Sequence, residues 1–330
     1  MERLLNMLCQ DSVRLKEEKR KTEIEKILKE ETDGLKRFYN EIAPSEKLDD
    51  NFRRWSEHLA ERLAQKYPDQ KQREAAMQEA GLFASELPVR HSTIYENISK
   101  SSVPYISSEF MLSKLSSADS SFKTGTLPMD RSYELDHFVY CSLGIEDTTE
   151  ERAEIVSMSQ GKNISHDTQF FIKNRILKDN NTLVALEDYA SHGAQRLWTQ
   201  ENLDKNSDAF DFHLQQIWRG NDFTKLFPMI LAYAYDNPSD FNERKPFPLD
   251  LVPDKLPRLT DRRNNICFPD FEVRIPSRIN PSDIEGIFIH PSAVQDKPVG
   301  KGVTITPVGL TASEERDFIM LKLKENRKQK

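Results

Sequence analysis

The segment NICFPDFEVRIPSRINPSDIEGIFIHP, residues 265–291, contains two strand-like runs on either side of a turn rich in proline, serine and asparagine. In the first run, FEVRIPS, apolar residues alternate with Glu272 and Arg274. An extended chain with this pattern presents its apolar side chains on one face and its charged pair on the other. We therefore predict two β-strands here, with Glu272 and Arg274 on the face opposite the apolar residues.

A second polar cluster lies on an earlier strand-like segment. LPVRHSTIYENI, residues 87–98, places arginine, histidine, serine and threonine in succession after a proline. Further short runs follow up to about residue 190, namely HFVYCSLGI, TQFFIKN and NTLVAL, separated by Ser, Asn and Gly. Short apolar runs bounded by such residues are typical of strands joined by turns. The pattern predicts a sheet of several short strands.

Helical patterns flank these strands. Residues 1–80 carry apolar residues at helical spacing among dense Lys and Glu, and DDNFRRWSEHLAERLAQKY adds an aromatic and aliphatic stripe behind an aspartate N-cap. Residues 208–236 are predicted to form a helix whose apolar second half is buried against the sheet. ASEERDFIMLKLKEN has the capping residues of a final helix.

The composition restricts the class of protein. The 330 residues are 37% hydrophobic and 31% charged with a net charge of −7, which fits a globular chain and gives no reason to expect nucleic acid as a partner. No stretch reaches the roughly 18 apolar residues of a membrane helix, and the N-terminus lacks the pattern of a Sec signal peptide. We expect neither membrane insertion nor general secretory export.

Neither the cysteines nor the histidines at positions 192, 213 and 290 predict a metal site. The three cysteines are far apart, with no Cys-x-x-Cys pair, and are expected to be reduced thiols in a reducing compartment. His192, His213 and His290 have no ligand spacing. We assign these histidines no role.

Helices that lead into short strands, with a polar cluster on the first strand and a lone glutamate on a late one, resemble NAD-using ADP-ribosyltransferases. VRHSTIYENI is similar to the Arg-His-x-Ser segment of the OspC family of bacterial type III effectors, which are arginine ADP-riboxanases. Four further segments resemble segments of that family and occur in the same order: DHFVYCSLGIE, NTLVALEDYASHG, WRGNDFTKLFPMILAYAY and FEVRIPSRINPSDIEGI. The resemblance spans about residues 85–290.

The resemblance implies an α+β fold: a helical N-terminal bundle followed by an ADP-ribosyltransferase-like split antiparallel β-sheet core with packed helices. We divide the chain into a helical N-terminal region, 1–80, a transferase-like domain, 81–294, and a C-terminal tail and helix, 295–330. The family carries ankyrin repeats after this domain, which this sequence lacks. The target protein is therefore not implied.

Two parts of the predicted site follow from the resemblance. It implies that Glu272 is the catalytic carboxylate and that His91, flanked by Arg90 and Ser92, contacts the NAD ribose or pyrophosphate. Successive strand residues point to opposite faces, so Arg90 and His91 should not both face the cleft, and we rank His91 first. Spacing alone leaves other interpretations open: an exposed cross-strand ion pair for Glu272, and a hydrogen-bonded strand residue for His91.

The resemblance also implies roles for Phe138 and Tyr140, which would border the nicotinamide pocket, and for Asp188, which would orient and deprotonate the target guanidinium. Tyr140 is open to interpretation as a core residue, and Asp188 as the N-cap of the next helix. Glu285 is a rival acid in a turn-like sequence. Cys141 and Ser142 replace the family's Phe and Gly.

The function expected is therefore that of an NAD-dependent transferase that ADP-ribosylates arginine on a host protein, with ADP-riboxanation as a second step. NAD is expected as the substrate, and delivery into the host cytosol by a specialised bacterial secretion system. The basic, amphipathic helices of residues 1–80 leave room for a host activator such as calmodulin. The alternative is a non-catalytic protein-interaction effector on a degenerate transferase fold.

Overall fold

The computed structural model describes most of the helices and the sheet. The described residues are 2–93, 106–115, 131–144, 168–186, 213–242, 245, 247–248, 250–253, 271–289, 303–305, 321–323, 325 and 327–328. In the first helix, side chains are described from residue 20 onward.

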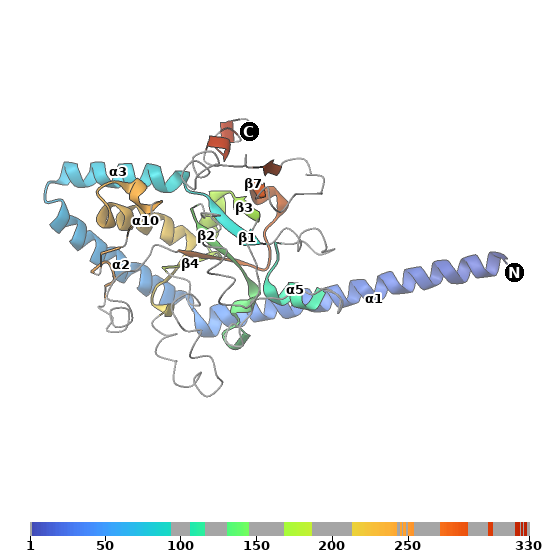
Figure 1. Ribbon diagram of the computed structural model, residues 1–330. Helices are drawn as coiled ribbons and strands as arrows, with labels where there is room; N and C mark the ends of the chain where they lie inside the picture. The colour runs from blue at the N-terminus through green and yellow to red at the C-terminus, as the bar shows by residue number, and fades with distance from the viewer. Residues whose placement is uncertain are drawn as a thin grey trace, which may run out of the picture.

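An eight-stranded sheet forms the centre of the molecule (Figure 1). The strands are β1 (Val89–Thr93), β2 (Phe138–Leu143), β3 (Thr168–Ile172), β4 (Leu183–Ala185), β5 (Ile217–Arg219), β6 (Glu272–Pro276), β7 (Ile284–Ile289) and β8 (Val303–Ile305). Their order is β5-β4-β6-β2-β1-β3-β7-β8, and all neighbours are antiparallel except β7 and β8. The predicted α+β class with an antiparallel sheet is confirmed.

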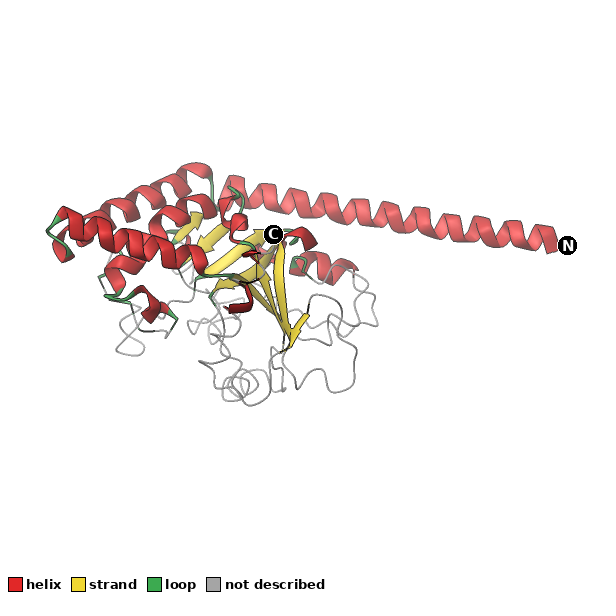
Figure 2. Ribbon diagram, turned by 90° about the horizontal axis from the view of Figure 1, so that it is seen from above, coloured by secondary structure: helices red, strands yellow, loops and turns green. Residues whose placement is uncertain are grey.

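The helices occupy two places. α2 (Ser45–Lys66), α3 (Gln70–Glu86) and α10 (Gly220–Ala234) pack together at one side of the sheet, whereas α1 (Glu2–Arg37) projects far from the body with only its last turns against it (Figures 1 and 2). A short helix, α5 (Glu109–Leu115), lies beside α1. None of the helices in the described ranges is both long and apolar enough to cross a bilayer.

Short helical turns complete the described structure. A π-helical turn, η1 (Phe38–Ile42), ends α1, and the other turns are 3₁₀-helical: η2 (Leu135–His137), η3 (Asn174–Lys178), η5 (Pro238–Phe241) and η6 (Pro281–Asp283). Local sequence explains where α3 begins, because the Asp69 carboxylate accepts the backbone N–H of Gln72 at 2.9 Å.

The larger hydrophobic core lies between the sheet and the helices. Trp55 of α2 and Trp218 of β5 are fully buried, with ring centroids 4.9 Å apart and perpendicular planes. The alternating apolar residues of β6, predicted to share one face, contribute to this core. Helices α2 and α3 therefore share a core with the sheet.

The opposite face of the sheet carries a second, smaller core beneath the end of α1. Its buried members are Phe38, Ala43, Leu48, Leu135, Phe138, Leu183, Ala185, Leu214 and Ile217. The charged pair of β6 lies on this face, because strand residues alternate between the two sides.

The prediction of one helix over residues 208–236 is wrong at residues 217–219, which interrupt it. Ile217–Arg219 is strand β5, which pairs with β4, and α10 begins only at Gly220. A side chain at Gly220 would overlap the carbonyl oxygen of Leu177, so the glycine permits a close approach of the two backbones. The apolar run is common to a buried strand and a buried helix, and only the pairing with β4 distinguishes them.

Candidate functional site

Strand pairing places Arg90 and Glu272 in one row across the sheet. Arg90 of β1 lies opposite Ser142 of β2, Ser142 lies opposite Glu272 of β6, and Glu272 lies opposite Ala185 of β4. Residues directly opposite each other in antiparallel strands point to the same face. Arg90 and Glu272 thus share the face covered by the end of α1, with one strand between their own.

His91 lies on the other face, as the alternation requires. Its Nδ1 is 2.8 Å from the carbonyl oxygen of Tyr140, and since a carbonyl only accepts, the proton is on Nδ1. The backbone pairing of β1 with β2 ends at Arg90, so the His91 imidazole bridges the two strands where their ladder stops. The structure therefore puts Arg90, and not the higher-ranked His91, on the side of Glu272.

Glu272 is the first residue of β6 and is buried in an ion pair. Its Oε1 accepts from Nε of Arg274, two residues along the same strand, and the side chains are 8% and 1% exposed. The pair is thus neither exposed nor cross-strand, which were the features of the simpler interpretation. Burying two charges is costly and tolerable only when they are paired.

Arg274 connects this carboxylate to two further groups. Its Nη2 is 2.6 Å from Nε2 of His213, and its guanidinium carbon lies 5.9 Å from the centre of the Tyr140 ring. A guanidinium has only donors, so Nε2 of His213 accepts and carries no proton. Glu272, Arg274 and His213 therefore form a buried chain of hydrogen bonds, with the Tyr140 ring near its middle.

The two aromatic residues predicted to border a nicotinamide pocket differ in their surroundings. The hydroxyl of Tyr140 donates to the carbonyl of Leu135 at 2.9 Å, and its partly buried ring faces Arg274. Phe138 is fully buried, and its ring meets that of Phe38 edge-on at 5.0 Å. Phe138 belongs to the smaller core, next to the Glu272 chain.

Of the remaining predicted positions, Ser92 lies opposite Gln169 of β3, on the same face as Arg90. Asp188 lies outside the described residues. The rival acid Glu285 is a residue of β7, and its carboxylate is held by the guanidinium of Arg327, with Nη2 3.1 Å from Oε2.

Cys141 of β2 points into the larger core. It is buried, and this burial raises the pKa of its thiol well above the usual range. Cys141 is therefore a neutral core residue on the face opposite Glu272.

The sequence did not predict the roles of two residues of this site, Arg274 and His213. Arg274 was placed on the face of Glu272 by the two-residue alternation, but only as an ion-pair partner. His213 was given no role, because it lies 61 residues before Arg274 and no local pattern relates the two. Comparisons with protein-family models, with curated proteins and with solved structures found no match to this chain.

Proposed function

We propose that the protein is an NAD-dependent transferase that ADP-ribosylates arginine on a host protein, with an ADP-ribosyltransferase-like sheet as its scaffold. The observation that carries the proposal is the shared row of Arg90 and Glu272. The first polar strand and the late glutamate strand are far apart in sequence, yet only β2 lies between them. The resemblance to the ADP-ribosyltransferases implies that these two strands lie close together in the sheet.

The reaction demands that charge be stabilised at two points on the dinucleotide. Glu272 is suited to hold a ribose hydroxyl and to stabilise the oxocarbenium-like ribose as the glycosidic bond to nicotinamide breaks. Arg90 is suited to bind a phosphate, for which a planar guanidinium has matching donors. Two strand spacings separate their backbones by about 10 Å, so a nucleotide lying across β2 can reach both.

Arg274 and His213 support this carboxylate. The ion pair with Arg274 fixes the direction of Glu272, and His213 fixes that of Arg274. Catalysis benefits when charged groups are held in place before the substrate arrives. The Tyr140 ring, beside Arg274, is the aromatic group we assign to the nicotinamide side of the site.

The further details of the proposal rest on the sequence resemblance. The second step would be riboxanation, in which Asp188 removes a proton from the modified guanidinium before it cyclises with loss of ammonia. Delivery by a specialised secretion system and activation by a host protein such as calmodulin belong to the same proposal.

The test is labelling with biotinylated NAD. Purified protein with a eukaryotic lysate should label a host band, and Glu272→Gln should abolish the label. Glu285→Gln is the matched control, because it also removes the charge of a sheet glutamate paired with an arginine. Equal labelling by the Glu272→Gln variant and wild type would contradict the site assignment.

One observation favours the alternative of a non-catalytic interaction effector: Glu272 is already engaged by Arg274. A carboxylate whose role is only to pair with Arg274 would take no part in catalysis. Calorimetry with NAD separates the two functions. The transferase should bind NAD in competition with nicotinamide, and a scaffold should release no heat with either.

A further inference from the structure

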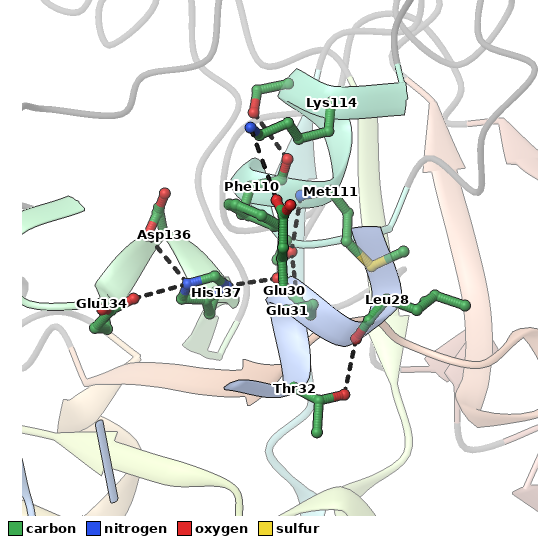
Figure 3. A network of polar contacts seen from close by, with 12 residues as sticks. Leu28, Glu30, Glu31, Thr32, Phe110, Met111, Lys114, Glu134, Asp136 and His137 are labelled. Atoms are coloured by element: carbon green, nitrogen blue, oxygen red, sulfur yellow. Dashed lines mark hydrogen bonds and ion pairs between the residues drawn. The ribbon is translucent and has the colours of Figure 1, made fainter. Parts of the chain in front are cut away.

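A second polar cluster lies where α1 crosses the start of β2, away from Glu272. It comprises Glu134, Asp136 and His137, from the turn that leads into β2, and Glu31 of α1 (Figure 3). Within this cluster His137 Nε2 is 2.9 Å from Oε2 of Glu134 and 3.9 Å from Oδ1 of Asp136. One ring nitrogen thus faces two carboxylates.

These distances are close to those between ligands of one metal ion. Bonds of 2.0–2.2 Å at tetrahedral angles separate neighbouring ligand atoms by about 3.4 Å. The two separations from Nε2 lie on either side of that value, and the three ligand atoms are all within 4.8 Å of one another. All three groups could bind one ion once the separation between the Glu134 and Asp136 oxygens also approaches this value.

The other ring nitrogen of His137, Nδ1, is bound to a carboxylate, as is common for histidines that bind a metal. Nδ1 is 2.6 Å from Oε2 of Glu31, whose second oxygen accepts from the hydroxyl of Ser108 at 2.6 Å. A histidine that binds a metal through one nitrogen commonly donates its other N–H to a carboxylate, which fixes the ring and its tautomer. Glu31 has this position, and it comes from a different helix.

Asp136 supplies an independent indication of a cation. Its side chain is 9% exposed, and no described side chain donates a hydrogen bond to it. Its carboxylate accepts a backbone hydrogen bond and lies 3.9 Å from His137 Nε2. A buried carboxylate is costly unless it is paired, and Figure 3 shows Asp136 directed toward the imidazole.

The surroundings leave room for an ion and its outer ligands. The three groups line a cavity of about 630 Å³ together with Arg37. Arg37 Nε is 2.6 Å from Oε1 of Glu134, so Oε2 remains directed at His137. Gly34 of α1 lies so close to the ring that a side chain there would overlap the imidazole, with Nε2 as the nearest atom, so only a glycine leaves this nitrogen unobstructed from the side of α1.

We propose that Glu134, Asp136 and His137 bind a divalent transition-metal ion of the zinc or manganese class, with Glu31 as the carboxylate that positions His137. Two carboxylates balance the charge of such an ion, and a nitrogen ligand favours it over calcium or magnesium. The remaining coordination position faces the cavity, where water or an anionic group can bind. The site also links α1 to the sheet, and it is independent of the proposed transferase function.

The test uses the full chain, freed of metal with a chelator and then titrated by calorimetry with ZnCl₂ and, separately, with MnCl₂. We expect one ion of either metal per chain at this site. Cobalt in place of zinc should show an absorption spectrum without the thiolate charge-transfer band that a cysteine ligand produces. Absence of binding, or a cobalt spectrum with that band, would overturn the proposal.

Variants then locate the ion. Asp136→Asn should lower the affinity at least about 10-fold, and Glu31→Gln, which leaves all three ligands in place, about 10- to 100-fold. Asp33→Asn is the control, because Asp33 lines the same cavity but is paired with the surface residue Lys36. Unchanged affinity in the first two variants would place the metal elsewhere. If circular dichroism shows that Asp136→Asn does not fold, the affinity of Glu31→Gln and the cobalt spectrum test the site in its place.

Discussion

Replacing Glu272 by leucine should destabilise the protein strongly, because it leaves the Arg274 guanidinium buried without its carboxylate. The Arg274 side chain is 1% exposed and the Glu272 side chain 8%, so water cannot take over the lost contact. Removing one partner of a buried ion pair costs about 3–5 kcal/mol of unfolding free energy.

The second half of the prediction is that replacing both partners is far less costly. Apolar residues of similar volume in place of a buried ion pair are often neutral or stabilising. In the double variant Glu272→Leu/Arg274→Met, His213 loses the hydrogen bond to Arg274, which is worth about 1 kcal/mol. We therefore expect a loss of roughly 1 kcal/mol, and a coupling energy between the two sites of at least about 2 kcal/mol.

Urea unfolding followed by tryptophan fluorescence measures these values, since Trp55 and Trp218 are buried in the core shared by helices and sheet. The control is Glu25→Leu, whose pair with Lys21 is exposed at both ends and should change stability by under about 1 kcal/mol. A Glu272→Leu cost below about 1 kcal/mol, or strictly additive effects, would show that the pair is hydrated and would refute the buried chain. If the double variant is folded and still fails to label host protein, the loss of labelling is due to the missing carboxylate and not to unfolding.

Four further outcomes follow from the packing. Gly34→Ala should lower the unfolding free energy by about 1–3 kcal/mol, because its side chain meets the His137 ring. Gly81→Ala, with no atom nearer than 4.0 Å, should instead raise it by up to about 1 kcal/mol, as thermal unfolding of the pair will show. In a variant lacking the other two cysteines, Cys141 should resist iodoacetamide at neutral pH until urea unfolds the chain, and rapid reaction of the native state would contradict its burial. Asn51→Leu should cost about 1–3 kcal/mol in urea unfolding, since its buried amide donates to two backbone carbonyls at 2.7 and 2.9 Å, and a neutral effect would contradict those bonds.

Much of the local structure could be predicted from the sequence. The alternation in FEVRIPS predicts that Glu272 and Arg274 share the face opposite the apolar residues, and this is confirmed. The same rule separates Arg90 from His91, although it could not say which of them faces Glu272. Helical spacing likewise predicts α1 to α3, because periodicity depends only on neighbouring residues.

The cluster around His137 was not predicted, although the sequence contains a signal for it. Glu134, Asp136 and His137 stand together in the sequence YELDHF, so a search for mixed carboxylate and imidazole ligands could have found them. Nothing in that sequence points to Glu31, which α1 brings to the cluster.

The sequence alone thus determined that helices lead into a set of short strands, and how the side chains of β1 and β6 alternate between the two faces. Only the tertiary structure decided which strands are neighbours. The two runs of residues 265–291 became β6 and β7, with β2, β1 and β3 between them, and residues 217–219 became a strand because β4 offered them partners. Strand pairing depends on the packing of the whole chain, whereas side-chain alternation is set by the backbone of a few residues. The placement of Arg90 and Glu272 on one face, two strands apart, and the hydrogen bond between His213 and Arg274 are products of that packing.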